Sequence, residues 1–153
     1  MTSEYIKLIA TNKKARHNYQ IESEYEAGIV LTGSEVKSIR EGKVSFQDSY
    51  ADIKNGELFL RQLHISPYKY AYYTNHETHR TRKLLLHRYE IRKLSSKIKE
   101  RGYTLVPLKI YFKNDKIKVL IGLGRGKKLY DKRETIKLKD VKRDLDRERK
   151  KYS

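Results

Sequence analysis

The sequence has no cysteine and no long run of apolar residues. Without cysteine there is neither a disulfide framework nor a thiolate metal site, which fits a reducing compartment. No stretch approaches the ~18 consecutive apolar residues of a membrane helix. The opening residues, MTSEYIKLIATNKK, lack the basic start and long apolar run of a secretory signal. We therefore expect a soluble, cytoplasmic protein with no membrane partner.

Apolar residues are also scarce, at 37% of 153 residues, so one domain is expected with part of the chain outside its core. Acidic residues become scarce in the second half. Residues 1–77 hold 10 basic and 10 acidic side chains, whereas residues 78–153 hold 26 and 9. The net charge of +17 therefore lies wholly after residue 77. This asymmetry favours a polyanionic partner, and nucleic acid is preferred to lipid because no basic segment has the Trp/Phe/Leu-rich face of an interfacial helix.

Five segments are predicted to be β-strands. HNYQIESEYEAGIVL alternates between apolar and polar residues, which is typical of a half-buried antiparallel strand. Its predicted inner face is Tyr19, Ile21, Tyr25, Ala27, Ile29 and Leu31. Residues 44–65 are predicted to form two strands joined at Asn55-Gly56, a strong hairpin signal. YTLVPLKIYF and KIKVLIGLG are predicted to be two more, joined at Asn114-Asp115, and Pro107 indicates an edge position or a bulge.

Two helices and a long loop are predicted between these strands. TGSEVKSIREG, residues 32–42, has Thr32 and Glu35 at capping-box spacing. HRYEIRKLSSKIKERG, residues 87–102, repeats its apolar residues at helical spacing. Residues 66–82 show no period and are interpreted as a loop containing four tyrosines. Strands with turn signals and few helices predict a mainly β protein, built as a small closed barrel.

The stretch GLGRGKKLYDKRE, residues 122–134, combines glycines with basic residues. A Walker-type phosphate loop is excluded, because Ile121 stands where its first glycine belongs and Lys128 where Ser or Thr should hold magnesium. After Gly126 charged residues dominate, so this tail is expected to be disordered when free. Leu138, Val141 and Leu145 could form one stripe of a helix against a partner. The stretch is interpreted as a hinge that leads into a tail.

Metal binding and catalysis are not favoured. His76 and His79 could ligate a metal, but zinc needs three or four ligands and no third is in view. No serine lies in a nucleophile-elbow pattern, and no cofactor is implied. The basic segments after residue 78 favour RNA binding, although the helix of residues 88–101 could simply be a solvated face. The alternatives are a nucleic-acid-processing enzyme and a general ribosomal or single-strand RNA-binding protein.

Several segments stand in the order and register of a known family, namely NKKARHNYQIESEYEAGIVLTGSEVKSIREGK, DSYA, HISPY, TRKLLLHRYEI, TLVPLKIYFKN and GKKLYDKRETIK. From about Asn12 to Lys142 the chain closely resembles the SmpB family, the bacterial tmRNA-binding proteins. The resemblance implies an OB-like closed antiparallel barrel of about six strands with two or three helices. It implies a barrel domain over residues 1–128 and a basic tail over residues 129–153 that becomes helical on the ribosome.

The resemblance also implies a function without catalysis. Such a protein binds the tRNA-like domain of tmRNA and delivers it to stalled ribosomes for trans-translation, while its tail occupies the empty mRNA channel near the decoding centre. The implied partners are tmRNA and the ribosome, through small-subunit RNA and the mRNA channel. Elongation factor Tu and alanyl-tRNA synthetase are implied only indirectly, through tmRNA.

The residue roles follow the family motifs. The implied tmRNA-binding residues are Asn12, Glu26, Leu85, Gly126, Lys127 and Lys128. The implied decoding-centre residues are Tyr130, Asp131, Lys132 and Arg133, where Tyr130 replaces the usual histidine. The expected tail contacts are Lys139, Lys142, Arg143 and Arg147.

A chemical reason for Glu26 does not follow from the residues alone, because a carboxylate repels phosphate. It must accept hydrogen bonds from bases or 2′-hydroxyls or orient a neighbouring cation, unless it is a solvated strand residue like Glu22 and Glu24.

Overall fold

The computed structural model describes residues 5–71, 75–100 and 102–127. Its strands are β1 (Ile6–Thr11), β2 (Tyr19–Ile29), β3 (Val44–Ser45), β4 (Tyr50–Lys54), β5 (Glu57–Arg61), β6 (His64–Ile65), β7 (Arg82–Leu85), β8 (Tyr103–Lys113) and β9 (Lys116–Gly126). Its helices are α1 (Lys13–Asn18), α2 (Gly33–Arg40) and α3 (Arg88–Ile98). The fold is therefore mainly β, as predicted, and the described part has three helices, where the residue pattern predicted two and the family resemblance implied two or three.

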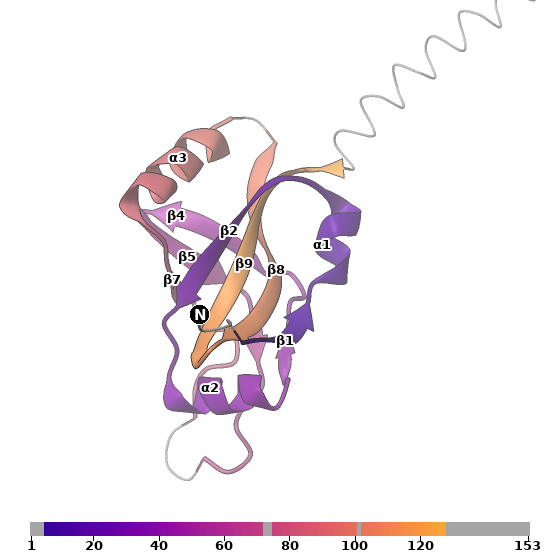
Figure 1. The fold of residues 1–153 in the computed structure, drawn as a ribbon, viewed down its shortest axis with the longest axis vertical. Helices are drawn as coiled ribbons and strands as arrows, with labels where there is room; N and C mark the ends of the chain where they lie inside the picture. The colour runs from indigo at the N-terminus through magenta and orange to yellow at the C-terminus, as the bar shows by residue number, and fades with distance from the viewer. Residues whose placement is uncertain (1–4, 72–74, 101, 128–153) are drawn as a thin grey trace, which may run out of the picture.

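Six strands form a closed ring. They pair in the order β8–β4–β5–β7–β2–β9, and β9 pairs back with β8. Every pairing around the ring is antiparallel. β1 pairs with β8 outside the ring, and β3 pairs with β6 in a separate two-stranded sheet. In Figure 1, α2 and α3 lie at opposite ends of the ring and α1 lies at its side.

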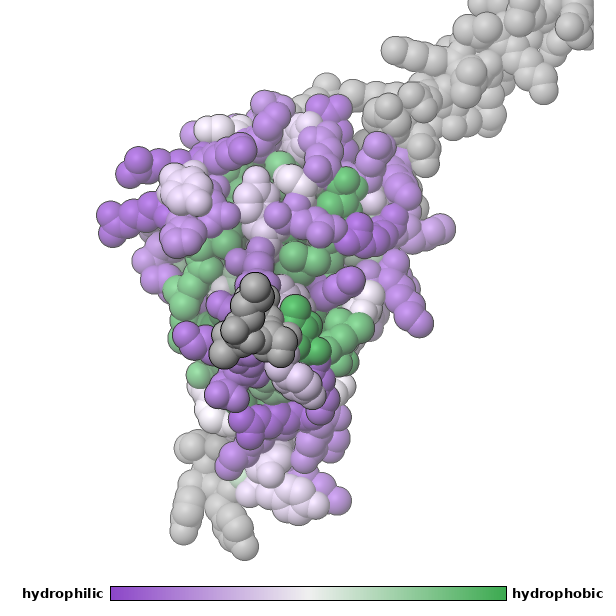
Figure 2. All heavy atoms as spheres, viewed as in Figure 1, coloured by the Kyte–Doolittle hydropathy of each residue, from purple (hydrophilic) through white to green (hydrophobic). Residues whose placement is uncertain are grey.

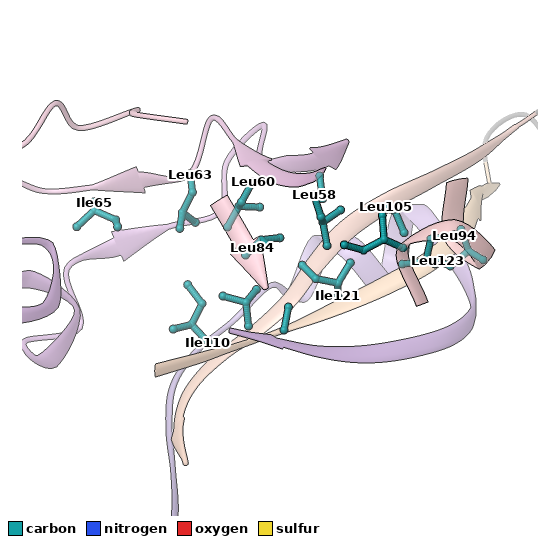
Figure 3. Packing of buried hydrophobic residues seen from close by; sticks show 14 of the residues in the cluster. Leu58, Leu60, Leu63, Ile65, Leu84, Leu94, Leu105, Ile110, Ile121 and Leu123 are labelled. Carbon is teal, nitrogen blue, oxygen red and sulfur yellow. The ribbon is translucent and has the colours of Figure 1, made fainter. Parts of the chain in front are cut away.

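The interior of the ring is filled by aliphatic side chains that alternate along the strands. Leu58 and Leu60 of β5, Ile110 of β8 and Ile121 of β9 are fully buried. Figure 3 shows a row of side chains on one side of the core, Leu58, Leu60, Leu63 and Ile65, which faces Leu84 and Ile110. Burial of one such side chain contributes about 1.5–3 kcal/mol, so this alternation is what specifies the register of the ring.

One prediction about β2 is wrong in part. The expected single inner face is interrupted, because the pairing of β2 with β9 shifts register between Ile21 and Ser23. Beyond this bulge Ala27 lies in the main core, whereas Tyr19 and Ile21 pack in a second cluster with Ala15 of α1. A bulge inserts one residue and so moves every later side chain to the other face. The second cluster is what holds α1 against the ring.

The turn signals are confirmed. Asn55 and Gly56 have φ of 54° and 75°, the left-handed pair that joins a tight hairpin. Thr32 and Glu35 form the predicted capping box at the start of α2. Pro107 lies at a register shift between β8 and β9, so it marks a bulge and not an edge, since β8 has partners on both sides.

Five elements were not predicted, namely β1, α1, β3, β6 and β7, since residues 44–65 were expected to form two strands and contain four. β7 closes the ring between β5 and β2, and its sequence RKLL is short and half basic. The first residue of β7, Arg82, is fully buried, which no periodic pattern indicates. α1 has one buried residue, Ala15, so it carries almost no amphipathic signal.

Arg82 forms a buried ion pair with Glu35, and both side chains have 0% exposure. Its guanidinium also donates to the carbonyl oxygens of Leu63 at 2.7 Å and Thr78 at 3.2 Å. The other oxygen of Glu35 accepts from Arg80 at 2.6 Å. Burial raises the pKa of Glu35, but hydrogen bonds from Arg80, Thr32 N and Arg82 outweigh it and hold the pKa below its usual value of 4.5.

We expect Glu35→Gln to lower the free energy of unfolding at neutral pH by about 3–5 kcal/mol, because it leaves the Arg82 charge buried without its partner. The wild type has a depressed Glu35 pKa, so this contribution is complete above pH 4.5 and is lost as pH falls through the lower folded value. Urea unfolding from pH 7 to pH 3 should therefore show a flatter pH profile for Glu35→Gln.

The matched control is Glu41→Gln, which removes an exposed ion pair of 3.2 Å with Lys43. Such a pair contributes at most about 1 kcal/mol. Equal losses in the two variants would contradict the role assigned to the buried pair.

Candidate nucleic-acid interface

A continuous outer surface runs across five strands. Cross-strand partners share one face of a sheet, and the register aligns Leu8, Tyr111, Lys118, Gly28 and Leu85 in one row from β1 to β7. The next row contains Glu26, Leu120, Lys109 and Thr11. Figure 2 shows patches of apolar side chains among hydrophilic ones across the middle of the molecule, over β2, β9 and β8. We name these two rows the outer face.

Glu26 is the charged centre of the outer face. Its carboxylate accepts a hydrogen bond from the Tyr111 hydroxyl and one from the Lys113 ammonium at 3.1 Å. Tyr111 is only 8% exposed whereas Glu26 remains open to solvent, so the bond joins a nearly buried phenol to an exposed carboxylate. Glu26 is therefore held in place and orients a neighbouring cation, while its carboxylate remains exposed to solvent.

Electrostatics keep this carboxylate charged. Partial burial raises the pKa of Glu26. Hydrogen bonds from Tyr111 and Lys113, together with the nearby charge of Lys118, outweigh this effect and hold the pKa below its usual value of 4.5. Burial and the Glu26 carboxylate raise the pKa of Tyr111, so the phenol stays protonated and can only donate to Glu26. The ionised carboxylate thus keeps oxygen lone pairs available for donors such as base amino groups or 2′-hydroxyls.

Leu85 lies beside this centre as an exposed apolar contact. It is 51% exposed although it is large and hydrophobic. Its register partner is Gly28, and a Cβ at Gly28 would lie 3.3 Å from the Leu85 Cβ. The small residue at position 28 therefore lets Leu85 lie flat along the face. A hollow of about 440 Å³, lined by Leu85, Gly28 and Lys118 among others, opens next to it.

Asn12 lies at the opposite border of the outer face, just after β1. Its side-chain amide donates to the carbonyl oxygen of Pro107 at 2.8 Å, and its backbone N–H donates to Leu108 O at 2.8 Å. Both bonds join the start of α1 to the bulge in β8. Asn12 thus fixes α1 and also lines a groove of about 700 Å³ with Lys13, Lys14 and the segment 44–49.

The glycines before the tail have separate roles. A Cβ at Gly124 would lie 2.5 Å from the backbone oxygen of Gln20, and one at Gly122 would lie 2.9 Å from Leu108. Gly124 needs glycine because the β2 backbone approaches it, whereas at Gly122 the ends of the Leu108 and Ile21 side chains would have to shift. Both residues lie inside the paired strand β9, so the hinge interpretation is wrong for them. Gly126 has only Tyr19 at 3.9 Å, and Lys127 follows it as the last described residue.

The structure brings together some predicted residues and not others. Glu26 and Leu85 lie on the outer face and Asn12 at its border, while Gly126 and Lys127 lie at the end of β9 beside Tyr19. The remaining predicted residues, Lys128, Tyr130, Asp131, Lys132, Arg133, Lys139, Lys142, Arg143 and Arg147, lie outside the described part of the chain.

Sequence reasoning missed the partners of Glu26. Tyr111 and Lys113 are 85 and 87 residues away in sequence, so only the pairing of β2, β9 and β8 reveals them. The alternation of residues in β8 could have indicated that Tyr111 lies on the outer side of the sheet. No sequence pattern indicates that it contacts Glu26.

The histidines of residues 76–79 serve the fold. His76 Nε2 lies 2.8 Å from Ile65 O and its Nδ1 lies 2.9 Å from the Ser34 hydroxyl. In the part of the chain that the structure describes, no three His, Cys, Asp or Glu side chains are grouped as metal ligands require. Within the same residues, no helix has the length and apolar character needed to span a membrane.

A closed ring of antiparallel strands with lysines on an exposed outer face defines a class, the small β proteins that bind nucleic acids. The family model described as SmpB protein matches residues 9–151. The chain belongs to the SmpB family.

Relatives with similar lengths support this assignment. An SsrA-binding protein of Syntrophobacter fumaroxidans is 58% identical over 97% of this chain and 92% of its own. Those of a Geobacillus species and of Bacillus subtilis are 60% and 57% identical over 92% of this chain, and the matches cover 91% and 90% of their lengths.

The fold also matches a solved structure described as "tmRNA-SmpB: a journey to the center of the bacterial ribosome". The TM-score is 0.66 and the identity 52%, over 76% of this chain and 82% of that one.

We expect Gly124→Ala to destabilise the protein by about 1–3 kcal/mol, because the new methyl group meets the Gln20 backbone, which cannot move without breaking β2 from β9. Gly126→Ala, with its nearest neighbour at 3.9 Å, should change stability by no more than about 0.5 kcal/mol. Urea unfolding of both variants tests this, and comparable losses would show that the close approach is not the reason for Gly124.

We expect Tyr111→Phe to raise the pKa of Glu26, because the first of the hydrogen bonds that lower it is removed while the burial that raises it remains. Titration of the Glu26 carboxyl carbon by NMR measures the change. Glu35 is an internal control, since its donors are Arg80, Arg82 and Thr32 N and its pKa should not move. An unchanged Glu26 pKa would mean that Lys113 and Lys118 alone hold the charge.

Proposed function

We propose that this protein binds the tRNA-like domain of tmRNA and delivers it to stalled ribosomes for trans-translation. The observation that carries the proposal is that SsrA-binding proteins 57–60% identical to the chain match it over more than nine tenths of its length. The function asks the chain to bind and position RNA, and it requires neither a catalytic group nor a cofactor.

In this proposal the ring of six strands is an OB-like closed barrel, and residues 1–128 form the RNA-binding domain. The closed order of the strands supports it, because a closed ring leaves its outer face free to bind while its interior is a packed core. Residues 129–153 form a separate basic tail.

The outer face supplies the proposed tmRNA site. Glu26 accepts hydrogen bonds from base amino groups or 2′-hydroxyls, and Lys113 stays bonded to it and offsets its charge near the phosphates. Leu85 packs against a base or ribose, because it offers an exposed apolar surface next to Glu26. Asn12, Gly126, Lys127 and Lys128 extend the contact toward α1 and the end of β9.

The tail acts on the ribosome in this proposal. Tyr130, Asp131, Lys132 and Arg133 lie at the decoding centre, where the planar Tyr130 ring stacks in place of the usual histidine. Lys139, Lys142, Arg143 and Arg147 then contact small-subunit RNA along the empty mRNA channel. Elongation factor Tu and alanyl-tRNA synthetase interact with the complex through tmRNA.

The test of the tmRNA site is Glu26→Gln, with Glu24→Gln as its matched control. We expect Glu26→Gln to weaken tmRNA binding about tenfold, because it removes an ionised acceptor held by Tyr111 and Lys113. Glu24 lies two residues away and pairs with the exposed Arg16, so Glu24→Gln should have little effect. Electrophoretic shifts at several salt concentrations, with bulk tRNA as competitor, provide the measurement.

Affinity should fall with salt at a log–log slope of roughly −0.7 to −0.9 for each phosphate contacted. Equal affinity for tmRNA and unrelated RNA would instead favour a general RNA-binding protein, and cleavage or modification of the RNA would reveal an enzyme.

A chain that ends after Lys128 should bind tmRNA with nearly wild-type affinity but fail to support peptide transfer on a stalled ribosome. Replacing Asp131, Lys132 and Arg133 together by alanine should produce the same defect with the rest of the tail present. tmRNA affinity and alanine transfer to the nascent chain are measured on the same preparations. Parallel loss of both would mean that barrel and tail form one RNA site.

A further inference from the structure

A second exposed surface lies away from the outer face, in the segment between β6 and β7. Four side chains form it: Tyr68, Lys69 and Tyr70 from this segment and Lys37 from α2. We name this group the tyrosine platform. In Figure 1 the segment extends beyond α2, at the end of the molecule opposite to where β9 ends.

The platform combines aromatic rings with ammonium groups. The Tyr68 and Tyr70 rings meet edge to face with centroids 5.6 Å apart. The Lys37 ammonium lies 5.3 Å from the Tyr68 ring, and the Lys69 ammonium lies 5.8 Å from the Tyr70 ring. Tyr70 is nevertheless 65% exposed, so most of its ring is available to a partner.

The segment that carries the platform is held firmly at its base. The side chain of Asn75 accepts from Tyr68 N at 3.1 Å and donates to Tyr68 O at 3.0 Å, which joins its two arms. Ile65 N donates to Thr78 O at 2.9 Å below this point.

Two further anchors connect the segment to the rest of the fold. His76 bridges Ile65 O and the Ser34 hydroxyl at the start of α2. Since a carbonyl only accepts, Nε2 of His76 donates to Ile65 O, and Nδ1 shares a hydrogen bond with the Ser34 hydroxyl. The buried Arg82 donates to Thr78 O and forms the ion pair with Glu35 of α2.

These anchors do not bury the tyrosines. A buried ion pair is weak evidence for stability, because apolar side chains of similar size can do as well, but it fixes geometry. Here the fixed geometry presents an exposed Tyr70 and keeps Lys37 against Tyr68. Pre-organised exposed aromatics lose little conformational entropy on binding, which makes them effective contacts.

The chemistry of the platform matches an unpaired nucleotide. A tyrosine face stacks on any base, and the adjacent ammonium groups offer charge to the phosphates on either side of it. Lys37 and Arg40 are one helical turn apart on α2 and extend the positive charge away from the rings. A protein partner fits less well, because the centre of a protein interface is usually apolar and the tyrosine platform carries cations there.

We propose that the tyrosine platform is a second RNA contact that stacks on an unpaired base, separate from the tmRNA site on the outer face. Such a base can come from tmRNA or from ribosomal RNA. This inference assumes that the protein acts on RNA, as proposed above, but not that Glu26 or Leu85 makes the contact.

The absence of tryptophan from the chain allows a direct test. Tyr70→Trp keeps a planar ring and introduces the only indole, whose fluorescence is quenched when a base stacks on it. The full-length variant is titrated with tmRNA, with naked small-subunit RNA, with total ribosomal protein and with stalled ribosomes carrying tmRNA. Tyr50→Trp is the control, because Tyr50 is 41% exposed on β4, which is not part of the outer face.

We expect quenching of Tyr70→Trp by one of the two naked RNAs, which identifies the source of the base, and by the stalled ribosome complex. Tyr50→Trp should not be quenched. Tyr70→Phe should retain wild-type affinity for the quenching RNA, and Tyr70→Leu, apolar but not planar, should weaken it about tenfold.

The inference is overturned by the absence of quenching with every RNA, or by quenching with ribosomal protein but with neither naked RNA. Measuring the tmRNA affinities of the wild type, Glu26→Gln and Tyr70→Leu side by side separates this inference from the proposed function. If Glu26→Gln weakens tmRNA binding while Tyr70→Leu changes no affinity, the proposed function stands and the platform does not bind RNA.

Discussion

The fold depends on one buried ion pair, between Arg82 at the start of β7 and Glu35 in the first turn of α2. β7 is the short strand that closes the ring between β5 and β2. Its first residue, Arg82, bonds at the same time to Glu35 of α2, to Leu63 after β5 and to Thr78 in the segment between β6 and β7. Because a buried charge without its partner costs several kcal/mol, alternative positions of β7 are strongly disfavoured. The pair therefore acts on register and placement more than on net stability.

A similar logic governs the outer face on a smaller scale. Tyr111 is nearly buried and Glu26 is not, so the fixed phenol holds the exposed carboxylate. The carboxylate in turn positions Lys113. In the proposed tmRNA site this arrangement makes a negative charge tolerable, because a cation lies within hydrogen-bond distance of it. Under that proposal the pairing of acid and base adds selectivity, since plain phosphate attraction would favour any RNA equally.

The sequence predicted the local structure well wherever a short-range rule applies. The turn at Asn55-Gly56 and the capping box of Thr32 and Glu35 each depend on residues within a few positions of one another. Pro107 indicated an edge position or a bulge, and the structure has the bulge. The misses have a different origin. β7 and the burial of Arg82 depend on Glu35, which is 47 residues away in sequence. The side of β2 on which Ile21 lies depends on a bulge that periodicity cannot locate. The hydrogen-bond partners of Glu26 likewise come from β8, and the family resemblance that singled out Glu26 did not indicate them.

The two edges of β8 are used unequally. One edge pairs with β9 along nearly its whole length, whereas the other is divided, with Lys109 to Lys113 on β1 and Leu105 alone in register with Ala51 of β4. Pro107, which has no N–H to donate, lies where the pairing partner of β8 changes from β4 to β1. Closure of the ring thus depends on a seam of one register pair, while every other junction of the ring has at least two. We expect backbone amides along this seam to exchange with solvent before those of the β8–β9 hairpin, so that the molecule opens as a curled sheet before it unfolds.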